Sequence, residues 1–388
     1  MSKTIKLFSL LASFALAGSL SPALAQTTAA TAAATPAAAA TPAPPTVTVD
    51  GLLDAYYSFN FTNSSNNASG LGNVGYFYNN VDNSFTLGLA EARLTATQGQ
   101  ASGHLVLAYG QETALGLNSN GYDVLQAYVS YNSGQWIFNA GRFVTWLGNE
   151  VIESNSNWNY SHSLLFNYIP LWHTGFSVNY APSSSFNVTG YVVDGNNNTF
   201  ASPDGKNYGL QAVITPDSMW TITLNGLVGP TAGSSVVPNN LTNMTGEGIF
   251  AFKPDSMWSF ALDAQYGMTD LPSGSTPSSG SYWGLALYGR DQIASDYAVA
   301  LRLEDVTDSG ELNLGQYINN SWVSGSFYEG TLTVEHNFTA NLLARLEGRY
   351  DTNSLPTGVG TNTAAKNLYA NSTASDQITG TASLVMSF

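Results

Sequence analysis

The sequence contains no cysteine, so disulfides and cysteine-ligated metals are excluded. After the N-terminal stretch it has no run of eighteen consecutive apolar residues, which excludes a helical membrane protein. Charged residues make up only 10%, well below the roughly 25% of an average globular protein. The 11 Lys and Arg against 26 Asp and Glu give a formal charge of −15, which argues against nucleic acid as a partner because phosphate binding needs a basic face.

Recognisable catalytic and metal-binding motifs are also lacking. The four histidines share no metal-binding spacing: His104, His162, His173 and His336. Nucleophile-elbow and phosphate-loop patterns are absent from the strand–helix context they need. His162 beside Ser161 or Ser163 could pair a base with a nucleophile, but such neighbours are common in a Ser-rich loop. We therefore expect no enzymatic activity, no cofactor and no metal.

The N-terminus has the features of a signal peptide. Lys3 and Lys6 precede a mostly apolar stretch, 7–20, that is too short to span a bilayer, and Ala23-Leu24-Ala25 supplies a cleavage pattern. We therefore expect residues 1–25 to be removed. Residues 26–45 are nearly all Ala, Thr and Pro and predict an extended or disordered periplasmic linker. The composition and residue pattern of 46–388 are uniform, which predicts one domain.

The C-terminal residues 377–388 alternate strictly. One face consists of apolar or small residues: Ile378, Gly380, Ala382, Leu384, Met386 and Phe388. The other face is mostly Ser and Thr, as expected of a strand with two different environments. This ending resembles the closing strand of a bacterial outer-membrane β-barrel, in which the terminal Phe belongs to a signal read by the assembly machinery. The alternative is an amphipathic strand of a soluble sheet.

A repeated pentapeptide marks turns between strands. Pro216–Trp220 recurs as Pro254–Trp258, 38 residues later, and each copy precedes an alternating run. Pro-Asp-Ser is turn chemistry, and proline cannot sit inside a central strand. The spacing equals two strands of about 11 residues with one short turn and one long loop. A propeller would need four strands per repeat.

The alternating runs predict an all-β protein with a single closed antiparallel transmembrane barrel. We count sixteen strands, near 47–61, 85–97, 101–112, 122–132, 135–143, 173–181, 186–194, 206–215, 219–229, 244–253, 257–268, 281–291, 296–306, 326–338, 341–351 and 377–388. Short and long connections alternate, as periplasmic turns and outer loops do in such barrels. Fourteen strands is the alternative, if a weak pair near 195–250 is over-counted.

The arginines that remain after cleavage all fall in these strands: Arg93, Arg142, Arg290, Arg302, Arg345 and Arg349. Because a lipid-facing Arg at mid-depth costs about 2–4 kcal/mol, we predict that each faces the interior. Glu304, Glu335 and Glu347 share the alternation of neighbouring arginines. A polar interior of this kind suits water and ions. These charges would also pair with one another and stabilise the wall.

The residues around the fifth predicted strand carry a family resemblance. Gly141-Arg142-Phe143, Gly148–Ile152, Asn159–Ser163 and His173-Thr174-Gly175 resemble the OmpL-like β-barrel porin family of bacterial outer membranes. The resemblance is looser over the hairpins to Phe388 and absent from 26–45. It implies an outer-membrane pore for small hydrophilic solutes.

The connection 144–172 is the third long one, and in sixteen-stranded porins that loop folds inward and narrows the channel. We therefore expect Glu150 and Glu153 to form an acidic rim that faces arginines such as Arg302, Arg345 and Arg349. The alternative is a loop that only covers the barrel mouth.

These observations predict a passive porin in the outer membrane. Its partners would be outer-membrane lipid and lipopolysaccharide, the assembly machinery through Phe388, small hydrophilic solutes and, by analogy with other porins, two further copies in a homotrimer. The acidic balance predicts mild cation preference. A sugar-selective channel and a secreted β-sandwich adhesin are the alternative functions.

Overall fold

The computed structural model describes residues 44–62, 72–116, 121–200, 205–230, 242–270, 279–309, 317–318, 321–322, 325–354 and 374–388. The expected signal peptide and all but the last two residues of the expected linker lie outside these ranges. Within them, no helix combines the length and apolar character needed to cross a membrane.

Sixteen strands close into one antiparallel barrel. Their bounds are β1 (Thr46–Asn60), β2 (Ser84–Gln98), β3 (Ala101–Tyr109), β4 (Tyr122–Ser133), β5 (Trp136–Val144), β6 (Trp172–Ser183), β7 (Phe186–Val193), β8 (Asn207–Ile214), β9 (Trp220–Pro230), β10 (Thr242–Phe252), β11 (Trp258–Asp270), β12 (Ser279–Asp291), β13 (Tyr297–Asp308), β16 (Gly325–Thr339), β17 (Leu342–Asn353) and β18 (Asp376–Ser387). A separate two-stranded sheet, β14 (Tyr317–Ile318) with β15 (Ser321–Trp322), lies between β13 and β16 in the chain.

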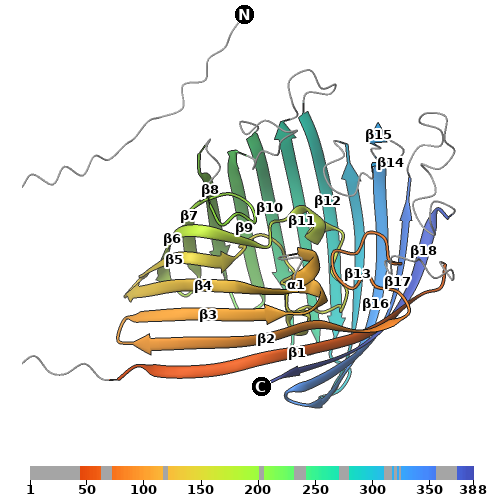
Figure 1. Ribbon diagram of the computed structural model, residues 1–388, viewed down its shortest axis with the longest axis horizontal. Helices are drawn as coiled ribbons and strands as arrows, with labels where there is room; N and C mark the ends of the chain where they lie inside the picture. The colour runs from red at the N-terminus through yellow and green to blue at the C-terminus, as the bar shows by residue number, and fades with distance from the viewer. Residues whose placement is uncertain are drawn as a thin grey trace, which may run out of the picture. The chain divides into compact units, whose positions relative to one another are not determined.

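The barrel closes where the two ends of the chain meet. Strands follow one another in chain order, and the blue β18 lies beside the red β1 in Figure 1. Leu52 is opposite Ser387 and Asn60 opposite Thr379. Closure pairs the backbone groups that an open sheet would leave at its edges. The prediction of sixteen strands is confirmed, and the alternative of fourteen is wrong.

Alternation along each strand separates two environments. On β17, Arg345, Glu347 and Arg349 are buried in the interior, whereas Leu346 and Tyr350 are exposed outside. The same pattern runs through β11, β12, β13, β16 and β18. The exterior is therefore apolar and aromatic, as a barrel in lipid requires.

The interior is more densely packed than the sequence indicated. Two clusters of buried apolar side chains lie inside, and the connection between β5 and β6 contributes to both. It supplies Leu147, Ile152 and Phe166 to the first cluster and Leu165 to the second. The polar interior predicted from the strand faces is therefore combined with apolar packing. The physical reason is that this connection brings its own apolar side chains and buries them against the wall.

Candidate functional site

Residues 145–171, which we call the lumenal segment, lie inside the barrel. They join β5 to β6 and contain two single-turn helices, η1 (Ser154–Ser156) and η2 (Leu165–Tyr168). The two ends of the segment are joined by a hydrogen bond, in which the Thr145 amide donates to the Leu171 carbonyl at 3.0 Å. Most of the segment lacks regular structure, so its buried backbone groups need partners on the wall.

Arg302 of β13 is the most heavily engaged wall residue. Its Nη1 lies 2.7 Å from Glu150 Oε1 and donates to the Ser161 carbonyl at 2.6 Å. Its Nε donates to Glu329 Oε2 at 3.0 Å. The side chain is fully buried. Buried guanidinium groups are stable only when paired in this way, so Arg302 ties the segment to β13 and β16.

Two further arginines, on β17, hold carbonyl groups of the segment. Arg345 donates to the carbonyls of Ser154 and Asn157, both at 2.6 Å. Arg349 donates to the carbonyl of His162 at 2.7 Å. Each arginine also has an acidic partner on the wall, so its charge is compensated while the carbonyls are satisfied.

Carboxylates of the barrel wall accept hydrogen bonds from backbone amides of the segment. Glu347 of β17 accepts from the amides of Tyr160 and Ser161, at 2.6 and 3.0 Å. Glu304 of β13 accepts from the Leu164 amide at 2.8 Å. Charged acceptors make stronger hydrogen bonds than neutral ones.

Three other strands also hold the segment. Glu247 of β10 accepts from the Gly148 amide at 2.9 Å. On β1, Asp54 accepts from the Ser154 hydroxyl at 2.5 Å and the Tyr160 hydroxyl at 2.8 Å. On β8, the Gln211 side chain donates to the Trp146 carbonyl at 3.1 Å. The segment is thus attached at widely separated positions around the barrel and crosses its interior.

The structure brings together most of the residues singled out in the sequence. Those that contact the segment or one another in its buried network are Glu150, Arg302, Glu304, Glu335, Arg345, Glu347 and Arg349. Glu150 does face Arg302, as expected. All seven are almost completely buried, so they bind the segment more than they meet solvent. Their role in lining the pore stays a prediction.

Arg93 and Glu153 keep partial exposure, with side chains 28% and 17% exposed. They lie 3.4 Å apart, and Arg93 also pairs with Glu91 at 2.5 Å. Glu153 is therefore the acidic residue of the segment with the greater access to solvent. Its contact with Arg93 also ties the segment to β2.

Arg142 lies apart from this network, whereas Arg290 joins it through Glu335. Arg290 pairs with Glu335 at 2.8 Å. Arg142 follows Gly141, whose φ of +134° interrupts the regular alternation of β5. It pairs with Asp123 at 2.5 Å and covers the ring of Trp172.

Sequence reasoning missed a second stretch that enters the barrel, residues 72–83 in the first long connection. The side chain of Asn73 donates to Ser58 Oγ at 2.9 Å, and the Val74 amide donates to Gln377 Oε1 at 3.0 Å. Tyr76 and Tyr78 are buried there, and burial raises the pKa of both hydroxyls well above the usual range. The concentration of aromatics at 76–78 was the available signal.

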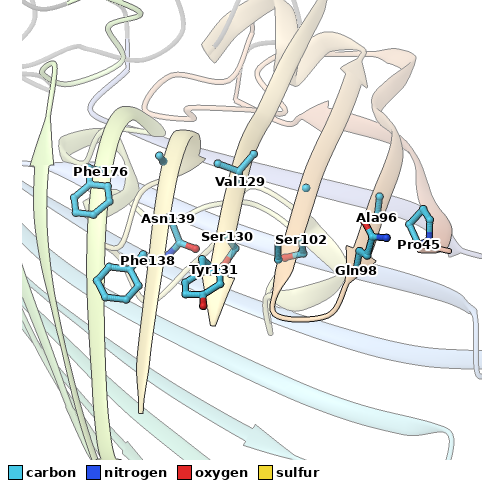
Figure 2. Close-up of a pocket in the computed structure, with 13 residues that line it drawn as sticks. Pro45, Ala96, Gln98, Ser102, Val129, Ser130, Tyr131, Phe138, Asn139 and Phe176 are labelled. Atoms are coloured by element: carbon cyan, nitrogen blue, oxygen red, sulfur yellow. The ribbon is translucent and has the colours of Figure 1, made fainter. Parts of the chain in front are cut away.

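A cavity of about 360 Å³ lies against the lumenal segment. Its lining includes Trp146, Glu150, Glu153, Tyr191 and Gln211, with two carboxylates and no lysine or arginine. A second hollow, of about 520 Å³, involves β2 to β6 (Figure 2) and includes exposed outward side chains such as Val129 and Phe176. We therefore place candidate solute contacts at the first cavity.

His162 has the contacts of a structural residue. Its Nε2 lies 2.8 Å from the Val151 carbonyl and 3.3 Å from Asn157 Nδ2. Burial lowers its pKa. Within the described residues, no hydrogen bond joins it to the hydroxyl of Ser161 or Ser163, the two nucleophile candidates.

Comparison with known proteins places the chain among porins. Residues 46–388 match the family model described as "Putative beta-barrel porin-2, OmpL-like". No curated protein matches the chain.

Three solved structures are similar over 89% of this chain. They are the anion-selective porin from Comamonas acidovorans (12% identity, TM-score 0.60, 100% of that chain covered), the channel DcaP of Acinetobacter baumannii (13%, 0.57, 98%) and the trimer form of OmpT of Vibrio cholerae (12%, 0.56, 100%). At these identities the similarity establishes the fold alone.

Proposed function

Because the chain belongs to the OmpL-like β-barrel porin family, whose model matches residues 46–388, we propose that it forms a narrow, water-filled channel through the outer membrane for ions and small hydrophilic solutes. The position of the lumenal segment is the reason to expect a narrow channel. The lumenal segment is tied to β1, β8, β10, β13 and β17 by hydrogen bonds, so it occupies space that an empty sixteen-stranded barrel would leave to water.

Passage along the segment favours cations over anions. The cavity beside it presents Glu150 and Glu153, and the arginines of β13 and β17 are compensated by acidic wall residues. A solute in this space therefore meets Glu153 first, whose charge is only partly compensated because its partner Arg93 also pairs with Glu91. Rings of acidic side chains select cations in other channels by the same electrostatics.

Reconstitution into a planar lipid bilayer tests this function. We expect small single-channel conductance and, under a salt gradient, a reversal potential of the sign given by cation permeation. Absence of conductance by folded protein would contradict the channel, and a reversal potential of the opposite sign would contradict the cation preference. Sugars added at millimolar concentration would block the current only if the channel is sugar-selective.

The adhesin alternative is not favoured, because the fold is a closed barrel and the matched family is one of porins. No enzymatic activity forms part of the proposal. A homotrimer is consistent with the trimer form of OmpT. Recognition by the assembly machinery is consistent with the paired terminal strand, where Phe388 exchanges two backbone hydrogen bonds with Gly51. Cross-linking in membranes tests the trimer, and deletion of Phe388 tests assembly.

A further inference from the structure

Glu112 is a buried carboxylate without a hydrogen-bond partner. It lies on the short helix α1 (Gln111–Gly116) and is almost inaccessible to solvent. Neither of its carboxylate oxygens accepts a hydrogen bond from the described residues. The Asn79 amide is near enough to favour the charged form, but not in hydrogen-bonding geometry. An ionised carboxylate in this position is strongly disfavoured.

The neighbours of Glu112 carry the same charge. They are Asp54 of β1, Glu91 of β2 and Glu153 of the lumenal segment. Arg93 is the cation in direct contact with this group, through Glu91 at 2.5 Å and Glu153 at 3.4 Å. Arg93 also lies 3.6 Å from Asp50, so its charge is divided among three carboxylates, none of which is Glu112. Like charges in a confined site raise the affinity of one of them for a proton.

Two more polar atoms in this place lack partners. Glu91 Oε1 and the Tyr78 hydroxyl are buried and unpaired, whereas both oxygens of Asp54 are engaged by Ser154 and Tyr160. Glu91 Oε1 is therefore a further buried acceptor that no donor among the described residues satisfies. The Tyr78 hydroxyl is a further buried polar atom of this cluster that has no partner among the described residues.

The ligand that fits this place is small. A Cβ added at Gly88 would lie 3.3 Å from Glu112 Oε1, so the wall is tightly packed against the carboxylate. Among the described residues, no group of three or more carboxylates or imidazoles is arranged to hold a metal ion. A proton removes the charge of the unpaired carboxylate and needs no additional space beside it.

The other elements packed against α1 offer no counter-charge. Strands β3 and β4 contact the helix, and their buried side chains include Val106, Ala108 and Leu125. The titratable inward groups of these strands are used elsewhere, since His104 contacts Ser102 and Thr95 and Asp123 pairs with Arg142. Tyr56 and Tyr160 are the remaining titratable neighbours, and their hydroxyls donate to the Gln111 side chain and to Asp54, respectively.

We propose that Glu112 holds a proton, and that this proton keeps the lumenal segment in place against β1 and β2. Burial, then the charges of Asp54, Glu91 and Glu153, raise the pKa of Glu112 well above its usual range. Because the folded protein binds this proton more tightly than the unfolded chain, its stabilising effect is lost as the pH rises through the folded pKa. The freed charge then repels Asp54 and Glu153, which hold this side of the segment.

Infrared spectroscopy of the protein in lipid vesicles tests the proton directly. We expect the difference spectrum, wild type minus Glu112→Gln, to show a protonated-carboxyl absorption at neutral pH that disappears on alkalinisation. Asp217→Asn is the control and should keep the absorption, because Asp217 is exposed in the turn between β8 and β9. The same absorption in the wild type and in Glu112→Gln would overturn the proposal.

The effect on the channel rests on the proposed function and is measured separately. We expect wild-type conductance to rise at alkaline pH and Glu112→Gln to stay at its neutral-pH value. Equal pH profiles would overturn the seating role. If neither protein conducts, the proposed function fails while the infrared result still decides the proton.

A second variant covers the case in which Glu112→Gln does not fold, as judged by its unheated mobility in electrophoresis. Glu91→Gln removes a neighbouring negative charge that favours protonation of Glu112, so the infrared absorption of Glu112 should disappear at lower pH than in the wild type. An unchanged titration in this variant would contradict the assignment of Glu91 as the neighbour.

Discussion

Arg302 and Glu150 form a fully buried ion pair between the barrel wall and the lumenal segment, with 2.7 Å between Nη1 and Oε1. Glu329 also binds the same guanidinium at 3.0 Å. The two residues are 152 positions apart in the chain. Their pairing attaches an irregular segment to the interior of a regular barrel. Four predictions test such attachments or the barrel wall itself.

Replacing Arg302 with Met should loosen the segment. Removing one partner of a buried ion pair leaves uncompensated charge and typically costs about 3–5 kcal/mol. We expect larger and noisier single-channel currents and a lower temperature of barrel unfolding in electrophoresis. Lys253→Gln is the control, because Lys253 is exposed beside a turn. A variant with the current of the wild type would show that Arg302 does not restrict the channel.

Glu150 and Glu153 should respond differently to neutralisation. Glu153→Gln removes a partly exposed charge at the cavity, so cation preference should fall while stability changes little. Glu150→Gln removes the partner of Arg302, so stability should fall by several kcal/mol. Reversal potentials and unfolding temperatures of both variants distinguish these effects. Unchanged selectivity in Glu153→Gln would count against the acidic rim.

The outward face should reject charge. Leu332 of β16 is 53% exposed on the side that alternates with Thr331 and Thr333. Arg at this position faces lipid and should cost about 2–4 kcal/mol if the site is near the bilayer midplane. Refolding yield into vesicles measures this, with Leu332→Phe as an apolar control. Equal yields for both variants would mean that this face does not meet lipid.

Acidification should weaken the seating of the segment through His162. Burial lowers the pKa of this imidazole, although Glu150 opposes the shift. The unfolded chain therefore takes up the proton more readily, and the stabilisation is lost as the pH falls below about 6.5. Thermal unfolding followed between pH 7 and pH 5 should show a loss that is smaller in His162→Gln. A loss of the same size in both proteins would assign it to other groups.

The sequence predicted the barrel well because its signals are local. Leu346 and Arg345 are adjacent, and their opposite environments follow from the two-residue period of a strand. The pairing of Leu52 with Ser387 closes the barrel, and the terminal alternation already indicated it. The buried charges were also identified, since arginine and glutamate on one strand face must avoid lipid.

The partners of those charges were less accessible. Carbonyl groups of Ser154 and His162 bind Arg345 and Arg349, and no side-chain pattern marks a backbone carbonyl as a ligand. Asp54 and Glu247 were missed for the same reason, because their importance comes from segment groups that reach them. The stretch 72–83 was expected only as an outer connection, yet it contacts Gln377 of β18.

By itself, the sequence determined a closed sixteen-stranded cylinder with an apolar exterior, because strand alternation and short turns act between near neighbours. The sequence also predicted that the connection 144–172 folds inward, but only the tertiary structure decided which wall residues hold residues 145–171, among them Asp54, Gln211 and Glu247. That outcome depends on groups far apart in the chain, which become neighbours only after the barrel has closed around the segment.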